Sequence, residues 1–435
     1  MPVIQHLRNF LRLPSEQPID PQVRVNFRRN FITNALDGSF WLLGESFVSV
    51  NTILPVFAST LTDSAVLIGL VPALVHAGWL LPQLFLAGYV KRLPKKLPFA
   101  KAMGLVERIP YLILPLTAFL LHWISGNAAI WIFMLVIAWR GFASGMVALP
   151  WQELIASVIP SAVRSRFFGV SRMIGRTMGV IGSVIAGIIL AELSYPDNYA
   201  LSFLIGGGFI WLSFFFFSRT VEPVMERSVS ESSEKPSKQP LIDLPAFKSI
   251  LQGDANFRKY LASRIFFQLG SMASGFLAVN GIQRFTLPDE QAAVFSALLF
   301  ASGILGFLVW GVFGDRVGPR SILLTSDLCQ AIVLVLAFIA PSVWVFYVIF
   351  LVFGFAQSGN VIGEMVMGMG LGPEAERPIY LGLARSIPGV FILIAPLIGG
   401  SLVEWVGYRV MFLVALAFGL LGVTFLVQVR ERKAA

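Results

Sequence analysis

The residues best placed to do chemistry are polar and ionisable side chains that lie inside long apolar runs. In the run from 32 to 58 they recur at helical spacing: Asn34, Asp37, Trp41, Glu45, Ser49 and Thr52. At 100° per residue these side chains fall within a stripe about 120° wide, which predicts one polar face on an otherwise apolar helix. An ionised side chain is costly in lipid, so each such residue is a candidate for binding a solute or carrying a proton.

Three further apolar runs carry polar side chains of the same kind. The run 260–283 holds Arg264, Gln268, Ser271 and Gly275, the run 342–368 holds Gln357, Asn360 and Glu364, and the run 127–149 holds Arg140. We therefore predict a substrate or proton pathway lined by Asp37, Trp41, Glu45, Arg140, Arg264, Gln268, Asn360 and Glu364.

Glu45 is the main mechanistic candidate, because it falls near the middle of its run. Two arrangements would make a carboxylate tolerable there. Glu45 can pair with Arg140 at matching depth, or it can hold a proton that leaves when the site opens to water. The second arrangement would couple proton movement to solute movement. Asp37 and Arg264 lie at similar depth in their runs and are predicted to form a second pair.

Acids outnumber bases within the apolar runs. The acids are Asp37, Glu45, Glu107, Asp327 and Glu364, and the bases are Arg108, Arg140 and Arg264. An unpaired carboxylate in a low dielectric tends to take a proton. The excess favours a proton-coupled carrier or a cationic substrate, although Arg172, Arg176 and Arg385 near the ends of the runs could cancel it.

The composition indicates the kind of protein that positions these residues. The 435 residues are 56% apolar and only 13% charged, whereas soluble domains average about 25% charged residues. Runs of roughly 20 apolar residues can cross a bilayer as helices. Twelve such spans are predicted near 32–58, 65–90, 101–122, 127–149, 169–192, 199–218, 260–283, 291–313, 321–340, 342–368, 383–403 and 409–428.

The basic residues set an orientation. Lys and Arg gather in the two terminal segments and in every second loop, while the other loops hold only Arg284 and Arg409. By the positive-inside rule both termini should be cytoplasmic. The polar stretch from Ser228 to Pro240 predicts a flexible linker. The expected organisation is a six-helix half at 1–218, a cytoplasmic linker at 219–256 and a second six-helix half at 257–435.

The two halves carry repeated sequence. Asn26-Phe27-Arg28-Arg29 before the first span reappears as Asn256-Phe257-Arg258-Lys259 before the seventh. Pro160, Arg164, Gly169 and Arg172 recur with identical spacing as Pro373, Arg377, Gly382 and Arg385. Two matches at equivalent places favour duplication, and duplicated halves place a binding site at their interface.

The loop after the eighth span carries a known pattern. Gly311, Asp315, Arg316, Gly318 and Arg320 have the spacing G-x-x-x-D-R-x-G-x-R. This resembles the loop signature of the major facilitator superfamily, as do the two sets of six spans and the polar central linker. The resemblance implies an all-α membrane protein of two six-helix bundles related by a pseudo-two-fold axis along the membrane normal. It also implies that Asp315, Arg316, Gly318 and Arg320 form a conformational lock.

The resemblance implies secondary active transport of a small organic solute by alternating access. The excess of acids favours coupling to protons, and the expected location is the cell (inner) membrane. In that family the first, fourth, seventh and tenth spans line the cavity, which is where the polar stripes occur. The matching loop of the first half, from Tyr89 to Lys96, has no Asp. A transport-inactive sensor or scaffold on the same fold therefore remains the alternative.

Other classes lack their characteristic residues. The chain has one Cys, Cys329, and three separate His, at 6, 76 and 122, so the sequence predicts no metal site and no cofactor. It shows neither a nucleophile motif for an enzyme nor a phosphate-binding loop for an ATP-driven pump. The expected partners are membrane lipid and a small solute, with or without protons, and not nucleic acid; the chain is expected to be a monomer.

Overall fold

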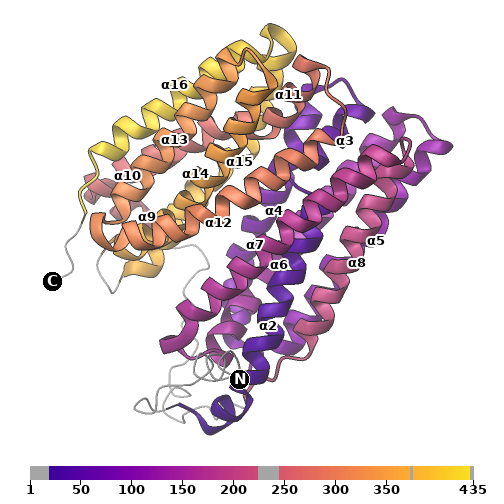
Figure 1. The fold of residues 1–435 in the computed structure, drawn as a ribbon. Helices are drawn as coiled ribbons and strands as arrows, with labels where there is room; N and C mark the ends of the chain where they lie inside the picture. The colour runs from indigo at the N-terminus through magenta and orange to yellow at the C-terminus, as the bar shows by residue number, and fades with distance from the viewer. Residues whose placement is uncertain (1–18, 224–243, 373–375, 432–435) are drawn as a thin grey trace.

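The computed structural model describes residues 19–223, 244–372 and 376–431, which are almost entirely helical (Figure 1). The first bundle contains α2 (Pro21–Phe47), α3 (Ile53–Leu61), α4 (Ala65–Arg92), α5 (Leu97–Phe119), α6 (Gly126–Val158), α7 (Ser161–Glu192) and α8 (Asp197–Ser218). The second contains α9 (Leu244–Gly253), α10 (Ala255–Gly270), α11 (Leu277–Phe285), α12 (Gln291–Val317), α13 (Pro319–Ile339), α14 (Val343–Gly370), α15 (Arg377–Val406) and α16 (Tyr408–Val427). The predicted all-α fold of two six-helix bundles is confirmed.

Within the described residues, 11 helices are long and apolar enough to cross a membrane. They coincide with eleven of the twelve predicted spans. The remaining one, predicted as a single helix over 32–58, is broken. α2 ends at Phe47, a short irregular segment follows, and α3 begins at Ile53. The polar side chains of α2 make it less apolar than the eleven other spans, so α2 is not counted among them.

The seventh span is interrupted at the equivalent level. α10 ends at Gly270, a 3-10 helix covers Ser271–Phe276, and α11 completes the span. Such breaks leave backbone groups without helical partners, which is tolerated in a membrane only where protein or water surrounds them. Thr52 in the first break bonds Ser296 of α12, and a Cβ on Gly275 in the second would lie 2.8 Å from Pro72 of α4, so both breaks occur where the halves meet.

Aromatic contacts define how the halves correspond. Phe40 stacks on Phe216 with ring centroids 5.4 Å apart and planes at 7°, and Phe266 stacks on Phe425 at 5.5 Å and 7°. Phe40 also lies 6.3 Å from Phe209, as Phe266 lies 6.2 Å from Phe418. Each half therefore joins its first span to its last through the same three-ring stack.

This correspondence corrects the repeat read from sequence. The side chain of Asn256 exchanges two hydrogen bonds with the backbone of Arg430, at 3.0 and 2.7 Å. In the first half the same exchange, with Val221, is made by Asn30 at 2.8 and 2.9 Å. Asn256 thus corresponds to Asn30 and not to Asn26. The two candidates lie one helical turn apart, and each is followed by Phe.

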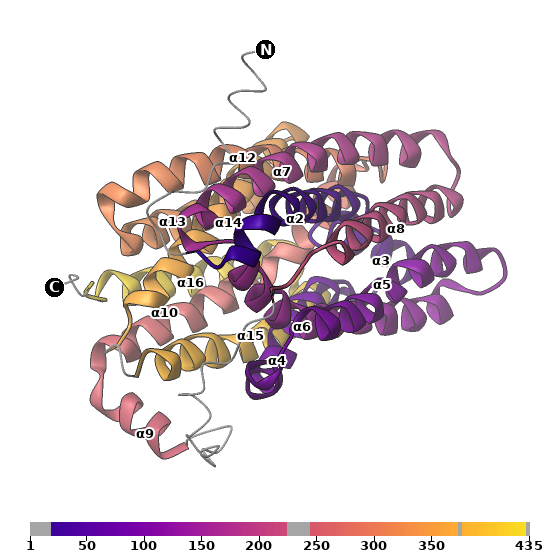
Figure 2. The ribbon, with the colours of Figure 1, turned by 90° about the horizontal axis from the view of Figure 1, so that it is seen from below.

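The two bundles meet along two seams. Figure 2 shows α7 beside α12 and α4 beside α15, and these are the largest contacts between the halves. Glycines let backbones approach there. A Cβ on Gly400 would lie 2.5 Å from the Cα of Val66, and a Cβ on Gly187 would lie 3.4 Å from Ala293. Small residues at helix crossings are typical of membrane bundles.

The bundles are joined at one end and separate at the other. We call the end that carries α3 and α11 the far end, and the end where α2 starts and α16 stops the terminal end. One buried apolar cluster includes residues of both halves, such as Phe57 of the first and Phe350 of the second. Toward the terminal end each half instead has its own cluster, around Phe31 and Phe167 in the first and around Phe257 and Leu323 in the second. The ribbons diverge there in Figure 1.

Hydrogen bonds between the halves follow the same asymmetry. Those for which both partners are described lie at the far end. Thr52 bonds Ser296, and Tyr199 donates to the Asp289 carboxylate at 2.9 Å. The Glu404 carboxylate accepts from the Ser64 hydroxyl at 2.9 Å and from a backbone N–H at the start of α4 at 3.3 Å. A carboxylate is favourably placed at a helix N-terminus. These contacts form a far-end latch.

The latch should respond to pH through Asp289, which lies in the loop between α11 and α12. Burial raises the pKa of the Asp289 carboxyl, against the hydrogen bond from Tyr199, and nearby Glu290 raises it further. The latched state therefore binds a proton more tightly than a state in which Asp289 meets water. The stabilisation that protonated Asp289 gives to the latched state is full below the ordinary carboxyl pKa of 3.8. It is lost as pH rises through the raised pKa.

Val50→Cys, in the segment between α2 and α3, measures this effect with Cys329 replaced by Ala. Because every thiol labels more slowly as pH falls, the same Cys is compared with and without Asp289→Asn. Labelling from the far side should slow more steeply with falling pH when Asp289 is present than in the Asn variant. Faster labelling at low pH, or an unchanged pH profile in the Asn variant, would contradict a role for Asp289 in the latch.

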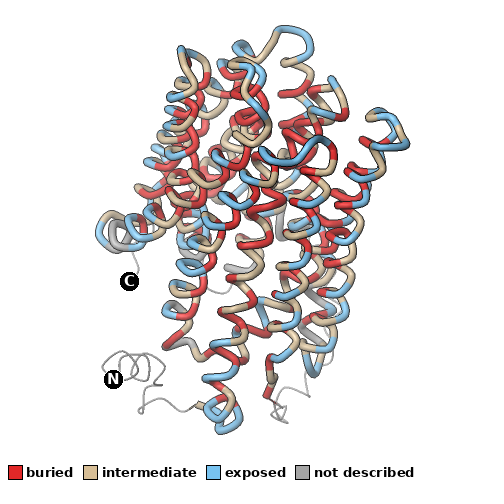
Figure 3. Tube along the Cα trace, turned by 45° about the vertical axis from the view of Figure 1, so that its right-hand side comes forward, coloured by how far each residue is buried: buried red, intermediate tan, exposed pale blue. Residues whose placement is uncertain are grey.

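The outer surface suits lipid. Figure 3 shows buried residues on helix faces turned toward other helices and exposed residues outside. Large apolar side chains are exposed there, including Leu135 at 70% and Phe85 at 69%. Exposed apolar area on this scale would be unfavourable in water.

The predicted linker 219–256 is only partly described. Residues 224–243, which include the stretch from Ser228 to Pro240, lie outside the described residues. Residues 244–253 form α9 rather than an irregular segment. Ile250 of α9 is buried in the terminal-end cluster of the second half, so this part of the linker packs on the second bundle.

Candidate functional site

The centre of the first half holds a three-residue cluster from α2, α5 and α6. Both Glu45 carboxylate oxygens lie 2.6 Å from the Arg140 guanidinium. Tyr111 donates its hydroxyl to Glu45 at 2.8 Å and accepts from Arg140 Nε at 2.8 Å. Arg140 is 4% exposed and Glu45 16%. Of the two arrangements considered for Glu45, the structure places it in the ion pair.

A second polar group lies one turn away. The Arg108 guanidinium is held between two rings, 4.9 Å from the centroid of Trp41 and 5.1 Å from that of Phe214. It also bonds the carboxylate of Glu107. Trp41 packs edge-on against Tyr111 at 5.9 Å, so it links the Arg108 group to the Glu45 cluster.

Asp37 is buried within the first half. Its carboxylate accepts a hydrogen bond of 2.6 Å from the Ser213 hydroxyl on α8. Asn34, one turn earlier, donates to Thr220 at 3.0 Å. The polar stripe of α2 therefore faces α8 at the terminal end and α5 and α6 near the centre.

The second half has one principal cluster. Arg264 on α10 bonds the carboxylate of Asp327 on α13, and both side chains are buried, at 2% and 1% exposed. On α14, the Glu364 carboxylate lies 3.6 Å from Arg264 and is 43% exposed, and the Asn360 oxygen lies 3.4 Å from Arg264. Glu364 is thus the carboxylate of this cluster that reaches water.

The predicted pair of Asp37 with Arg264 is wrong. Each residue bonds within its own half, Asp37 to Ser213 and Arg264 to Asp327. Depth along a helix can be estimated from sequence, but the direction in which each helix face points cannot. Asp327 was available at the same depth on a helix of the same bundle.

The remaining predicted residues have local roles. Gln268 accepts a hydrogen bond of 3.4 Å from Ser271 where the seventh span breaks.

Tyr111, which completes the Glu45 cluster, was missed because sequence reasoning searched for charged groups. A hydroxyl one turn after Arg108 in an apolar run is the signal that could have identified it.

Two carboxylates that sequence reasoning missed cap equivalent helices at the terminal end. Glu222 accepts from the backbone N–H groups of Lys96 and Leu97, at 2.8 and 2.9 Å, where α5 begins. Glu431 accepts from the N–H of Arg320 at 2.7 Å, where α13 begins. Gly318 precedes α13 with φ 81, and a Cβ there would meet the Glu431 carboxylate at 2.7 Å.

The predicted lock residues surround this second cap. Arg320 donates from its side chain to the carbonyls of Leu426 and Val427, while Arg316 is exposed. The side chain of Asp315 is not among those described, so its partner stays a prediction.

Removing a cap should cost stability. Glu222→Ala should lower the free energy of unfolding by about 0.5–2 kcal/mol, because two N–H groups of α5 lose their acceptor. Glu376→Ala is the matched control, since Glu376 precedes α15 without a side-chain cap. Thermal unfolding in detergent compares them. Equal midpoints for the two variants would contradict the cap.

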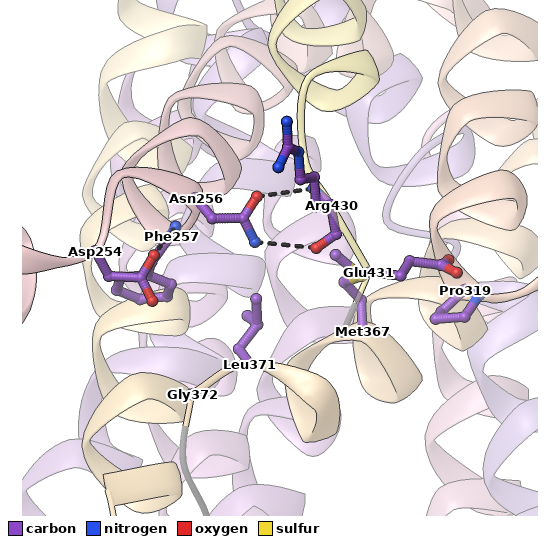
Figure 4. A pocket seen from close by; sticks show the side chains of 9 residues that line it. All are labelled: Asp254, Asn256, Phe257, Pro319, Met367, Leu371, Gly372, Arg430 and Glu431. Atoms are coloured by element: carbon purple, nitrogen blue, oxygen red, sulfur yellow. Dashed lines mark hydrogen bonds between the residues drawn. The ribbon is translucent and has the colours of Figure 1, made fainter. Parts of the chain in front are cut away.

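A small pocket of about 80 Å³ lies beside the Glu431 cap (Figure 4). Its lining is Asp254, Asn256, Phe257, Pro319, Met367, Leu371, Gly372, Arg430 and Glu431. Figure 4 shows the Asn256 amide paired with the Arg430 backbone. These groups already bond one another, so the pocket belongs to the helix ends and not to the polar clusters of the spans.

In the described part of the chain, no three His, Cys, Asp or Glu side chains come close enough together to hold a metal ion. The clusters around Arg140 and Arg264 are instead ion pairs enclosed by helices. Such groups can change partners when a proton, a solute or water reaches them.

Comparison with known proteins agrees with this geometry. Residues 260–435 match the family model described as Major Facilitator Superfamily. No curated protein matches the chain in sequence. Solved structures share its fold at low identity.

Three of these structures cover nearly the whole chain. A D-xylose-proton symporter has a TM-score of 0.67 and 16% identity, over 94% of this chain and 98% of the other. The nucleoside transporter NupG has 0.62 and 16%, over 93% and 99%. A bacterial homolog of the human lysosomal transporter Spinster, inward-facing and unoccupied, has 0.61 and 15%, over 96% and 100%.

Proposed function

We propose that this chain is a proton-coupled secondary transporter of the major facilitator superfamily, whose family model matches residues 260–435. It moves a small organic solute across the membrane by alternating access. The observation that carries the proposal is the one-ended joining of the halves. They share a core and hydrogen bonds at the far end and have separate cores at the terminal end.

The orientation follows from charge. The Lys and Arg residues favour cytoplasmic termini and a cytoplasmic linker in the cell (inner) membrane, which makes the present state inward-facing. Protease added outside intact cells should then leave the stretch from Ser228 to Pro240 uncut, and protease added to inside-out vesicles should cut it. The reverse pattern would overturn this orientation.

We propose that Glu45 carries the coupling proton even though it is paired with Arg140 here, because protonation of its carboxylate would open the ion pair. Its carboxylate is the more exposed partner of Arg140, so a proton or solute can reach it before reaching the guanidinium. Asp37, Trp41, Arg140, Arg264, Gln268, Asn360 and Glu364 are the proposed remainder of the substrate and proton pathway.

The conformational lock is proposed for the terminal end. Arg320 holds the start of α13 against the end of α16, and Gly318 leaves room there for the Glu431 carboxylate. Asp315 and Arg316 end α12, which forms one seam between the halves. We propose that they close the terminal end when the far-end latch opens.

Solute uptake by proteoliposomes tests the function. A panel of radiolabelled sugars, nucleosides, organic acids and amines would be applied under an imposed pH gradient, with and without a protonophore. Gradient-dependent accumulation of one class supports a proton-coupled transporter. Flux that ignores the gradient would remove the coupling but keep the transporter. No flux of any class would favour the sensor or scaffold alternative.

A further inference from the structure

Two arginines on α7 lack the acidic partners that the other arginines in the spans possess. Arg108, Arg140 and Arg264 each bond a carboxylate. Arg172 and Arg176 form no ion pair with any described residue, and Arg176 has a buried Nη1 without a hydrogen-bond partner. Its guanidinium lies 4.8 Å above the ring of Phe307 on α12. A half-buried cation with no acidic partner, such as Arg176, is unfavourable.

Arg176 lies on the face of α7 that meets the other half. A Cβ on Gly179, one turn from Arg176, would contact Phe300 of α12, and a Cβ on Gly303 of α12 would collide with Arg176 itself. Arg172 continues this face by one turn toward the terminal end and is exposed. Arg176 therefore lies at the seam between α7 and α12, and Arg172 lies one turn beyond it.

The fold itself does not require an arginine at 176. The repeat that relates Arg172 to Arg385 also relates Arg176 to Gly389. In the second half Gly389 faces Leu80 of α4, as Arg176 faces Phe307 of α12. The same seam is thus built once with a small residue and once with a cation.

We infer that Arg172 and Arg176 bind the oxyanion of the solute, and that the substrate is a small organic anion bearing a carboxylate or phosphate. Two guanidinium groups one helical turn apart can each donate paired hydrogen bonds to such a group. With Arg172, Arg176 and Arg385 included, the spans no longer carry the acid excess that favoured a cation. This inference rests on the proposed function and specifies its substrate class.

Binding by purified protein in a neutral detergent tests the inference. The probes are gluconate and glucose 6-phosphate, with glucose as their neutral counterpart and dioctanoyl phosphatidylglycerol as the lipid probe. Arg172→Gln combined with Arg176→Gln is compared with wild type and with Arg409→Gln, which removes one positive charge from an exposed position. Size-exclusion profiles verify folding, and single Gln substitutions replace the double variant if it aggregates.

At least one anion should bind wild type, and glucose should not. Its affinity should fall roughly ten- to hundredfold in the double variant, as expected for losing charge-assisted hydrogen bonds, and remain unchanged in Arg409→Gln. Equal binding by the double variant, or no binding of either anion to wild type, would overturn the inference. Binding of the lipid alone would also overturn it, since the arginines would then hold a headgroup.

The uptake panel separates this inference from the proposed function. Accumulation of a neutral or cationic solute without anion binding would leave a transporter and remove the anion site. Anion binding that depends on the two arginines, without flux of any solute, would leave the site and remove transport.

Discussion

Arg264→Ala should destabilise the protein by about 3–5 kcal/mol, because it leaves the Asp327 carboxylate buried without its partner. Both side chains are at most 2% exposed, so water cannot replace the lost contacts. Glu364 also loses Arg264 as a partner, but this loss should cost less because its carboxylate is 43% exposed and water can solvate it. The free energy of unfolding, measured in detergent with a denaturant series, should fall accordingly.

The partner is identified by rescue. Adding Asp327→Asn to Arg264→Ala should recover part of the lost stability, because the unpaired charge is removed. Adding Asp37→Ala should recover none, since Asp37 bonds Ser213 in the other half. Recovery by Asp37→Ala, or failure of Asp327→Asn to help, would contradict the pairing.

Glu45→Gln should abolish gradient-driven accumulation while retaining counterflow exchange. The amide cannot release a proton, and it cannot accept two hydrogen bonds from Arg140 as the carboxylate does. Losing one charge-assisted bond corresponds to about 1.5–3 kcal/mol, which is roughly a ten- to hundredfold effect. Accumulation of the solute identified by the uptake panel should fall by at least that range.

Tyr111→Phe is the matched variant for Glu45→Gln. It removes a hydroxyl from the same cluster but keeps the ion pair, so accumulation should fall less and remain dependent on the gradient. Loss of solute binding in Glu45→Gln would make Glu45 a ligand of the solute. Full gradient-driven transport by Glu45→Gln would exclude it from coupling, and Asp37 would become the next candidate.

The spans could be read from sequence because lipid imposes a minimum length of apolar helix. The same rule could not place the break after Phe47, which depends on contacts between the halves. The repeat was recognisable, but Asn26 and Asn30 each precede Phe one turn apart. Only the bond from Asn30 to Val221 distinguishes them.

The site was predicted in part for a similar reason. The residue types and depths of Glu45 and Arg140 followed from costly charges in apolar runs. Asp327 and Asp37 were equally good partners for Arg264 by depth, and the direction of each helix face decides between them. Tyr111 and the caps Glu222 and Glu431 act through geometry that spacing does not encode.

Reciprocal movement of the two ends of the bundles is the most direct test of alternating access. Spin labels would report the far-end distance from Trp123→Cys to Trp344→Cys, and the terminal-end distance from Val25→Cys to Ala255→Cys. All four positions are exposed, and Cys329 would first be replaced by Ala. Weakening the latch with Glu404→Gln and Tyr199→Phe should lengthen the far-end distance and shorten the terminal-end distance. Distances that stay fixed, or that lengthen at both ends together, would contradict alternating access by these two bundles.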